Sequence, residues 1–318
     1  VIGDTEFGPQ QVSLRSDWRA HDSEMGRQPM ATRPADRAAA PVPAEGDPGV
    51  ASTAGTVEVL FRPDPAAYDG RFANNGWLQE LPKPMTKLTW DNAALVSPAL
   101  AGRLGLENEE VIELRTGDLA LEAPVWIVPG QADGVVALHL GYGRRRGGEL
   151  ANGCGFDAYA LRTSSAPWSG TSVELRKTGG RSDLASTQDH HSMEGRELVR
   201  VGTLAEYEKH PHFVHEGQHI EKMSMYQDYE YNGYSWGMTI DLNACTGCNA
   251  CTIACQAENN IPVVGKYEVS VGREMHWIRV DRYFEGSLDN PAVYHQPVPC
   301  MHCENAPCEA VCPTNATV

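Results

Sequence analysis

Short apolar runs separated by turn residues dominate the sequence from residue 56 to residue 143. In one run, Ile112 and Leu114 alternate with charged residues, which is the pattern of a strand with one buried face. Gly117 and Gly130 mark turns after two of the runs. The region is therefore predicted to be a compact β domain with strands at TVEVLF (56–61), VIELR (111–115), LEAPVWIV (121–128) and VVALHL (135–140).

A short helix is predicted between the first two of these strands. Ser97 has the side chain of an N-cap, Pro98 suits the first helical turn, and Gly105 suits the end of the helix. Two further strands are predicted towards the C-terminus, at WGMTIDL (236–242) and HWIRVDRYF (276–284).

The other segments have weaker patterns. Residues 1–55 include a stretch rich in Pro, Ala, Asp and Arg with few large apolar side chains, which predicts an extended arm or linker. Residues 144–233 have weak periodicity and are predicted to be an irregular connector, and residues 234–318 are rich in cysteine. The expected fold class is α+β, mainly β: a small barrel domain at 56–143 and a second domain at 234–318, joined by long connecting loops.

Composition and charge exclude several classes of protein. The 318 residues include 31 Gly and 21 Pro, which favours loops and short strands over a helical bundle. The formal net charge of -16 opposes binding to phosphate backbones, so no nucleic acid partner is expected. No window approaches about 18 consecutive apolar residues, so no membrane-spanning segment is predicted.

Eight of the nine cysteines fall in two tight groups, unlike the scattered cysteines of a secreted disulfide framework. The first group has the spacing C-x2-C-x2-C-x3-C, which is that of bacterial ferredoxins, and the second has C-x2-C-x4-C-x3-C-P. Gly247 permits a tight turn in the first group, and Pro313 ends the turn that carries the last cysteine. The predicted ligands of iron-sulfur clusters are Cys245, Cys248, Cys251, Cys255, Cys300, Cys303, Cys308 and Cys312. No catalytic acid or base is predicted.

Zinc and disulfide bonds are the alternatives for these cysteines. Four-cysteine zinc sites also start from C-x2-C spacing. However, a zinc site does not require a third cysteine at x2 followed by a fourth at x3. Cysteines three residues apart on a loop have poor geometry for several parallel disulfides. The ninth cysteine, Cys154, is predicted to be a small buried or half-buried residue.

Four other groups of residues carry two interpretations each. His302 and Glu304 either tune the potential of a cluster or lie exposed in a loop. Gly141 and Gly143, followed by three arginines at 144–146, either form a site for a pyrophosphate or belong to a barrel that binds no cofactor. Four tyrosines either line a contact with a membrane subunit or pack as an aromatic cluster: Tyr226, Tyr229, Tyr231 and Tyr234. Six histidines suggest a metal or haem site, but their irregular spacing favours solvated or structural positions: His190, His191, His210, His212, His215 and His219.

The cysteine groups and their flanks resemble a known family. A close resemblance to the iron-sulfur part of the B subunit of bacterial alternative complex III, a quinol oxidoreductase, is carried by YNGYSWGMTIDLNACTGCNACTIACQAENNIPVVGKYEVSVGREMHWIRVDRYFEG (231–286) and QPVPCMHCENAPCEAVCPTNATV (296–318). The same two cysteine motifs open the four-cluster subunits of polysulfide, dimethyl sulfoxide and nitrate reductases. A resemblance to the pterin-dinucleotide-binding barrel of molybdopterin oxidoreductases is carried by NNGWLQELPKPMTKLTWDNAALVSPALAGRLGL (74–106). The segment TQDHHSMEGRELVRVGTLAEYEKHP (187–211) resembles the connector of the same B subunit.

This resemblance implies a fold, a function and partners. The fold is a molybdopterin-dinucleotide-binding-type β-barrel followed by a ferredoxin-like iron-sulfur domain. The function is electron transfer from membrane quinol towards a haem-carrying cytochrome or a copper protein, and the alternative is the electron-transfer part of a molybdopterin reductase of the polysulfide or dimethyl sulfoxide type. The cofactors are 4Fe-4S clusters, with one 3Fe-4S cluster allowed in the complete subunit, and no molybdopterin. An integral quinol-binding subunit, a haem-carrying subunit and other subunits would hold the chain on the periplasmic face of the membrane.

The resemblance also leaves two pairings of the cysteines open. In a two-cluster ferredoxin, the first three cysteines of each group share a cluster with the last cysteine of the other group. In the four-cluster family, the exchange runs between the first and fourth motifs and between the second and third. Cys255 and Cys312 would then each complete a cluster whose other ligands lie outside these residues. Because the family has a large region before the barrel and two further motifs downstream, the chain is expected to be part of a longer polypeptide.

Overall fold

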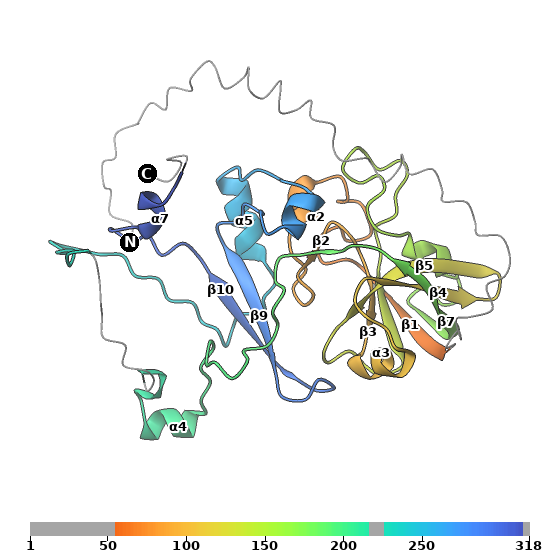
Figure 1. Ribbon diagram of the computed structural model, residues 1–318, viewed down its shortest axis with the longest axis horizontal. Helices are drawn as coiled ribbons and strands as arrows, with labels where there is room; N and C mark the ends of the chain where they lie inside the picture. The colour runs from red at the N-terminus through yellow and green to blue at the C-terminus, as the bar shows by residue number, and fades with distance from the viewer. Residues whose placement is uncertain (1–54, 216–225, 314–318) are drawn as a thin grey trace, which may run out of the picture. The chain divides into compact units, whose positions relative to one another are not determined.

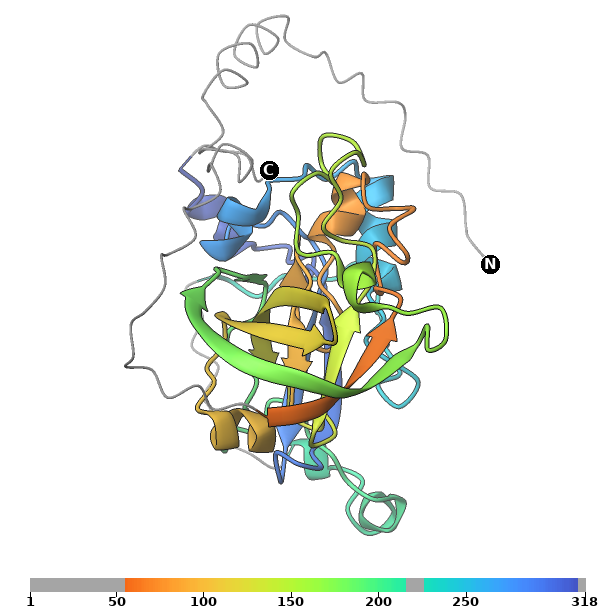
Figure 2. The ribbon, with the colours of Figure 1, turned by 90° about the vertical axis from the view of Figure 1, so that its right-hand side faces the viewer.

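The computed structural model describes residues 55–215 and 226–313. Its first part is a closed barrel of six strands in the order β1-β6-β3-β5-β4-β7 (Figures 1 and 2). Strand β1 is parallel to β6, and β3 is parallel to β5, whereas the other neighbouring pairs are antiparallel. The strands are β1 (Gly55–Arg62), β3 (Ala94–Val96), β4 (Glu110–Thr116), β5 (Leu119–Ile127), β6 (Val135–His139) and β7 (Ser169–Arg181).

The inside of the barrel is filled by alternate side chains of its strands. Val59 on β1, Ile112 on β4 and Leu138 on β6 are each 0% exposed. Burying a side chain of this size contributes about 1.5–3 kcal/mol, so the alternation determines which face of each strand points inward. Closing the sheet also removes its edges, which would otherwise present unpaired backbone groups.

The four strands predicted between residues 56 and 143 are confirmed as β1, β4, β5 and β6. The predicted helix is α3 (Pro98–Leu104): Ser97 Oγ accepts a hydrogen bond from the N–H of Leu100, and Gly105 ends the helix with φ of 62°. The barrel extends past the predicted limit at residue 143, because β7 lies in the segment expected to be an irregular connector. Strand β7 contains only two buried apolar side chains, Val173 and Leu175, among glycines and charged residues.

Short elements make up the rest of the residues before the cysteine-rich region. They are α2 (Gly76–Glu80), β2 (Leu88–Thr89), η2 (Ala158–Leu161), β8 (Ala185–Ser186), α4 (Leu204–Lys209) and η3 (Phe213–His215). Strands β2 and β8 pair with each other, and α4 begins at a capping box formed by Thr203 and Glu206. The predicted arm at residues 1–55 lies outside the described residues, apart from Gly55.

The cysteine-rich region combines short helices with a two-stranded sheet. Its elements are α5 (Ala250–Glu258), α6 (Lys266–Ser270), β9 (Arg279–Glu285), β10 (Ala292–Val298) and α7 (Pro307–Ala310). The strand predicted at 276–284 corresponds to β9, which pairs with β10. The strand predicted at 236–242 is wrong, since these residues form no strand and Trp236 is fully exposed. None of the helices in the described ranges has the length and apolar character needed to cross a membrane.

The segment around α2 connects the barrel part to the cysteine-rich part. The indole N–H of Trp77 donates a hydrogen bond to the carbonyl of Ile261, at 2.7 Å. The fully buried carboxylate of Glu80 accepts hydrogen bonds from the backbone N–H groups of Val264 and Gly265 and from the indole N–H of Trp90. The bonds to Ile261, Val264 and Gly265 join residues more than 180 positions apart in the sequence.

Replacing Glu80 with alanine is expected to lower the free energy of unfolding by about 3–5 kcal/mol. The change leaves one buried donor, on Trp90, and two half-buried donors, on Val264 and Gly265, without an acceptor. An unsatisfied buried donor costs about 1–3 kcal/mol, and the half-buried donors cost less because water can reach them. Urea unfolding followed by circular dichroism measures the loss. The matched control is Glu122→Ala on β5, because Glu122 is exposed and its removal should change the stability by less than about 0.5 kcal/mol. Equal stabilities of the two variants would contradict this account of Glu80.

Candidate metal centre

The first cysteine group lies on a loop and on the helix that follows it. Cys245 and Cys248 are in the loop, and Cys251 and Cys255 are one turn apart on α5. The Asp241 carboxylate accepts hydrogen bonds from two backbone N–H groups in this loop, and its carbonyl accepts one from the N–H of Cys245, at 3.1 Å. The predicted tight turn is present, since Gly247 has φ of 66°.

Helix α5 has a buried polar side and a side that carries the cysteines. Thr252 and Gln256 are buried, whereas Cys251 is exposed and Cys255 is half-buried. The side-chain amide of Asn259 donates to the carbonyl of Cys255 at 3.0 Å and lies 3.5 Å from the Cys255 Sγ atom. Such an N–H group is suited to stabilise a thiolate at this position.

The second cysteine group follows strand β10 and includes α7. Cys300, Cys303 and Cys308 are exposed, and Cys312 is half-buried. The Tyr231 hydroxyl donates a hydrogen bond to the Glu304 carboxylate at 2.7 Å, and this bond raises the pKa of Tyr231. The predicted influence of His302 and Glu304 on a cluster stays a prediction.

The eight cysteine thiols of the two groups are suitable ligands for iron, although they do not converge on a common point. All nine cysteines lie in the described ranges, and none forms a disulfide. Over these ranges, no group of three or more His, Cys, Asp or Glu side chains is arranged to hold a metal ion. Eight thiols with soft sulfur donors, five of them exposed, together with the turn at Gly247, are compatible with iron-sulfur ligation.

The four tyrosines ahead of the first cysteine group are exposed. Two of them, Tyr229 and Tyr231, contact each other edge to face with ring centroids 5.1 Å apart. The side-chain amide of Asn305 donates to the carbonyl of Gln227, so this segment also lies against the second cysteine group. The aromatic pair is present, and the predicted contact with a membrane subunit stays a prediction.

Cys154 is half-buried, as predicted, and packs against the small cluster that includes Tyr142 and Ala151. Burial, and next the charge of Asp91, raises the pKa of its thiol to about 11. The thiol donates to the carbonyl of Leu150 at 3.1 Å. Cys154 is therefore a protonated packing residue at neutral pH.

The glycines considered as a pyrophosphate cradle are explained by close backbone packing. A Cβ atom on Gly141 would lie 2.7 Å from the backbone nitrogen of Gly70, and one on Gly143 would overlap the backbone of Asp157. The guanidinium of Arg144 donates to the carbonyl of Asp69 at 3.3 Å. Both glycines are therefore required by the fold without any bound phosphate.

The predicted solvated or structural histidines include both kinds. His191 packs edge to face against Phe284, with centroids 6.0 Å apart, and burial lowers its pKa. His190, His210 and His212 are exposed. His219 lies outside the described residues.

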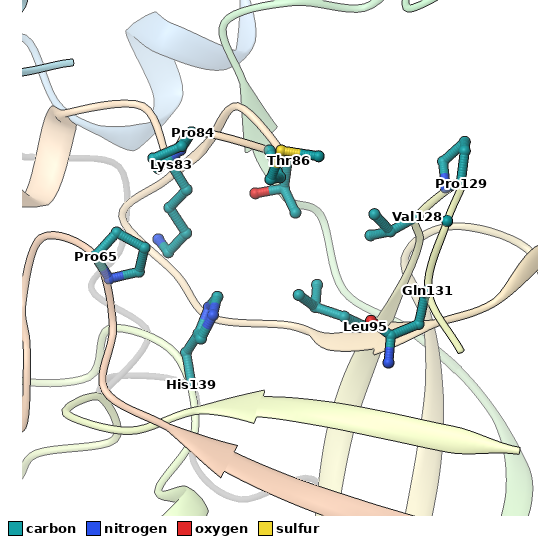
Figure 3. A pocket seen from close by; sticks show the side chains of 11 residues that line it. Pro65, Lys83, Pro84, Thr86, Leu95, Val128, Pro129, Gln131 and His139 are labelled. Carbon is teal, nitrogen blue, oxygen red and sulfur yellow. The ribbon is translucent and has the colours of Figure 1, made fainter. Parts of the chain in front are cut away.

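A pocket beside the barrel is lined in part by Lys83 and His139 (Figure 3). Figure 3 shows Lys83 and His139 towards one end and Pro129 and Gln131 towards the other, and none of the candidate cysteines lines this pocket. The Asp64 carboxylate lies 3.6 Å from both Lys83 Nζ and His139 Nδ1. Burial lowers the pKa of His139 to about 4, although the charge of Asp64 partly offsets this effect.

Lowering the pH from 6.5 to about 4 is expected to destabilise the protein through His139. The folded state keeps this imidazole neutral, whereas the unfolded state takes up a proton below about pH 6.5, so stability falls by up to about 1.4 kcal/mol per pH unit over this range. Urea midpoints at pH 7 and pH 5 measure the effect. His139→Gln should lose less stability than the wild type between these values, and the exposed control His190→Gln should behave as the wild type. If His139→Gln lost as much stability as the wild type between pH 7 and pH 5, His139 would not be the cause of the pH dependence.

Residues 244–316 match the family model described as a 4Fe-4S dicluster domain. The chain therefore carries iron-sulfur clusters, and the cofactor prediction is confirmed in this respect. Zinc, the alternative weighed for the cysteines, is not the cofactor of the matched domain. The fold combines a six-stranded barrel with a ferredoxin-type 4Fe-4S region.

Three curated relatives are components of reductases. The iron-sulfur cluster-binding subunit of menaquinone reductase from Nitratidesulfovibrio vulgaris is 38% identical over 96 residues, which are 30% of this chain and 36% of the relative. A putative iron-sulfur subunit of dimethyl sulfoxide reductase from Halobacterium salinarum is 35% identical over 96 residues, or 26% of this chain and 33% of the relative. The B polypeptide of polysulfide reductase from Wolinella succinogenes is 42% identical over 83 residues, or 26% of this chain and 39% of the relative. The chain thus spans about a third of the length of these relatives.

Among solved structures, acetylene hydratase from Pelobacter acetylenicus matches 38% of this chain and 18% of its own, with 14% identity and a TM-score of 0.30. This likeness is too weak to identify the family of the barrel.

Proposed function

We propose that this chain is the iron-sulfur electron-transfer part of a multi-subunit, quinone-linked oxidoreductase of the molybdopterin reductase type. The match of residues 244–316 to a 4Fe-4S dicluster domain carries the proposal. Similarity to iron-sulfur subunits of menaquinone and dimethyl sulfoxide reductases and to the B polypeptide of polysulfide reductase supports it. Iron-sulfur clusters supply one-electron transfer when bound.

In this proposal the eight cysteines of the two groups are the iron ligands. Cys245, Cys248 and Cys251 bind one cluster, and Cys300, Cys303 and Cys308 bind another. Cys255 and Cys312 complete clusters under either pairing. The protein holds the thiolates and provides nearby charges, and no side chain has to act as an acid or a base.

The partners in this proposal are an integral quinone-binding subunit and further subunits that hold the chain on the periplasmic face of the membrane. The segment from Tyr226 to Met238 supports a contact of this kind, because it has five exposed aromatic side chains and contacts the second cysteine group through Gln227 and Tyr231. Exposed apolar patches of this kind commonly mark interaction surfaces.

Alternative complex III is a second candidate, favoured by one observation. A barrel and an iron-sulfur region are present in one polypeptide and are joined by the hydrogen bonds of Trp77 and Glu80. In that case the chain relays electrons from quinol towards a haem-carrying subunit, and the barrel binds no pterin.

Metal and cofactor analysis of the purified, assembled complex tests these proposals. Electron paramagnetic resonance (EPR) signals of iron-sulfur clusters are expected, with iron in excess of zinc. Stoichiometric molybdenum and pterin would identify a molybdopterin reductase, whereas haem without molybdenum, together with quinol oxidation, would identify the second candidate. Zinc in place of iron, with no cluster signal, would overturn both.

A further inference from the structure

The lysine that precedes strand β2 is buried, and its segment contacts the first cysteine group. Lys87 is 1% exposed and precedes strand β2. Its backbone is fixed on both sides, because its N–H donates to the carbonyl of Lys83 and its carbonyl accepts from the N–H of Thr187. Its ammonium group has no hydrogen-bond partner among the residues that the structure describes. A buried charge of this kind is costly unless another charge compensates it.

Two further basic residues lie close to Lys87. Arg282 on β9 is 4% exposed and pairs across the two-stranded sheet with His295 on β10. The guanidinium of Arg282 lies over the ring of Phe284, 4.3 Å from its centroid. Arg282 Nε and His295 Nδ1 also lack partners among the described residues. Lys87, Arg282 and His295 are called the basic cluster below.

The basic cluster faces the loop of the first cysteine group. A Cβ atom on Gly247 would overlap His295 Nδ1, so the imidazole lies directly against this loop. Burial, and next the charge of Arg282, lowers the pKa of Lys87 to about 8, while the charge of Asp281 opposes this shift. The side-chain amide of Asn249, which lies between Cys248 and Cys251, donates a hydrogen bond to the carbonyl of Pro82, so the segment that leads to Lys87 contacts the first cysteine group.

Nearby carboxylates do not neutralise the positive charge of the basic cluster. Asp281 is bound to the guanidinium of Arg279, at 3.0 Å. Across residues 55–215 and 226–313, no ion pair joins Lys87 or Arg282 to a carboxylate. The thiols of the first cysteine group lie on this side of the basic cluster, and they become anionic when they bind iron.

We infer that Lys87, with Arg282 beside it, compensates the negative charge of the cluster bound by Cys245, Cys248 and Cys251 and raises its reduction potential. The inference rests on the proposed function. Reduction adds one negative charge to a cluster, and a fixed positive charge in a poorly solvated place favours that form. Lys87 is thus a positioning residue for electron transfer, contributed by the barrel part of the chain.

The test is an EPR-monitored redox titration of the assembled complex, with iron determined on the same samples. In Lys87→Met, which keeps the length of the side chain, the midpoint of the first-group cluster should fall by about 59 mV or more, a tenfold change in the reduction equilibrium. Lys87→Arg should keep the wild-type midpoint. Lys177→Met is the matched control for net charge, because Lys177 on β7 pairs with Glu110 in the barrel.

Each outcome decides the inference. The inference would be overturned if Lys87→Met kept both its full iron content and the wild-type reduction midpoint of the first-group cluster. It would also be overturned if Lys87→Met and Lys177→Met shifted this midpoint equally. If Lys87→Met and Lys87→Gln both lose iron while Lys87→Arg retains it, charge compensation is supported, and loss of iron from Lys87→Arg as well would overturn it. The absence of any iron-sulfur signal from the wild-type complex would instead overturn the proposed function.

Discussion

Cys248→Ala is expected to remove one cluster, with its four irons, from the assembled complex. Under either pairing of the cysteines, Cys248 supplies one of three thiolates to a single cluster, and an alanine leaves one iron without its ligand. Cys248 is exposed and lies outside helix α5, so the substitution removes a ligand without opening a cavity in a core. Iron analysis and EPR spectra of the reduced complex measure the loss.

The control for this prediction is Cys154→Ser. Cys154 is half-buried in a packed cluster near the barrel, and its thiol has a pKa of about 11, so it is protonated at neutral pH. This variant should keep all iron and every cluster signal. If Cys248→Ala also kept its iron and signals, the assignment of the first cysteine group as ligands would be wrong.

The barrel could be predicted in part because a strand with one buried face has a local signature. Runs such as VIELR show the alternation directly, and β4 buries Ile112 and Leu114 as expected. Strand β7 shows no such signal, because Val173 and Leu175 are separated from other apolar residues by glycines and charges. Its place is determined by pairing with β1 and β4, which are distant in the sequence.

The strand predicted at residues 236–242 is absent, although its apolar residues alternate as they would in a strand. Trp236, Met238 and Ile240 alternate in the sequence, but all three are exposed, and no neighbouring strand pairs with them. Alternation predicts a strand only where another segment covers the apolar face. The same side chains support the proposed contact with a partner subunit.

Only part of the candidate site could be predicted from the sequence. The spacing of the eight cysteines is local, so the iron-sulfur chemistry could be predicted from the sequence and is supported by the family match. Glu80 and Lys87 could not be predicted, because they lie in a segment that contacts the cysteine-rich region only in the folded chain. His295 could not be predicted either, because the loop at Gly247 that it contacts is distant in the sequence. A lysine in the segment PKPMTKLTW has no feature that distinguishes it from a solvated one.

Gly247→Ala is expected to disrupt the first cysteine group almost as severely as removal of a ligand. Gly247 has φ of 66°, where an alanine costs about 1–2 kcal/mol, and its new Cβ atom would overlap the imidazole of His295. Either the loop or His295 must move, and the loop carries Cys245 and Cys248. Iron content and EPR signals should show loss of the same cluster as in Cys248→Ala.

A matched variant separates backbone strain from the overlap with His295. Gly272 has φ of 70°, and a Cβ atom there would meet nothing within 4 Å. Gly272→Ala should therefore cost about 1–2 kcal/mol of stability and keep all iron. Loss of iron from both variants would show that strain alone displaces the clusters, and full iron in Gly247→Ala would show that the loop tolerates a side chain against His295. Only loss confined to Gly247→Ala agrees with a cysteine loop held in place by close contact with strand β10.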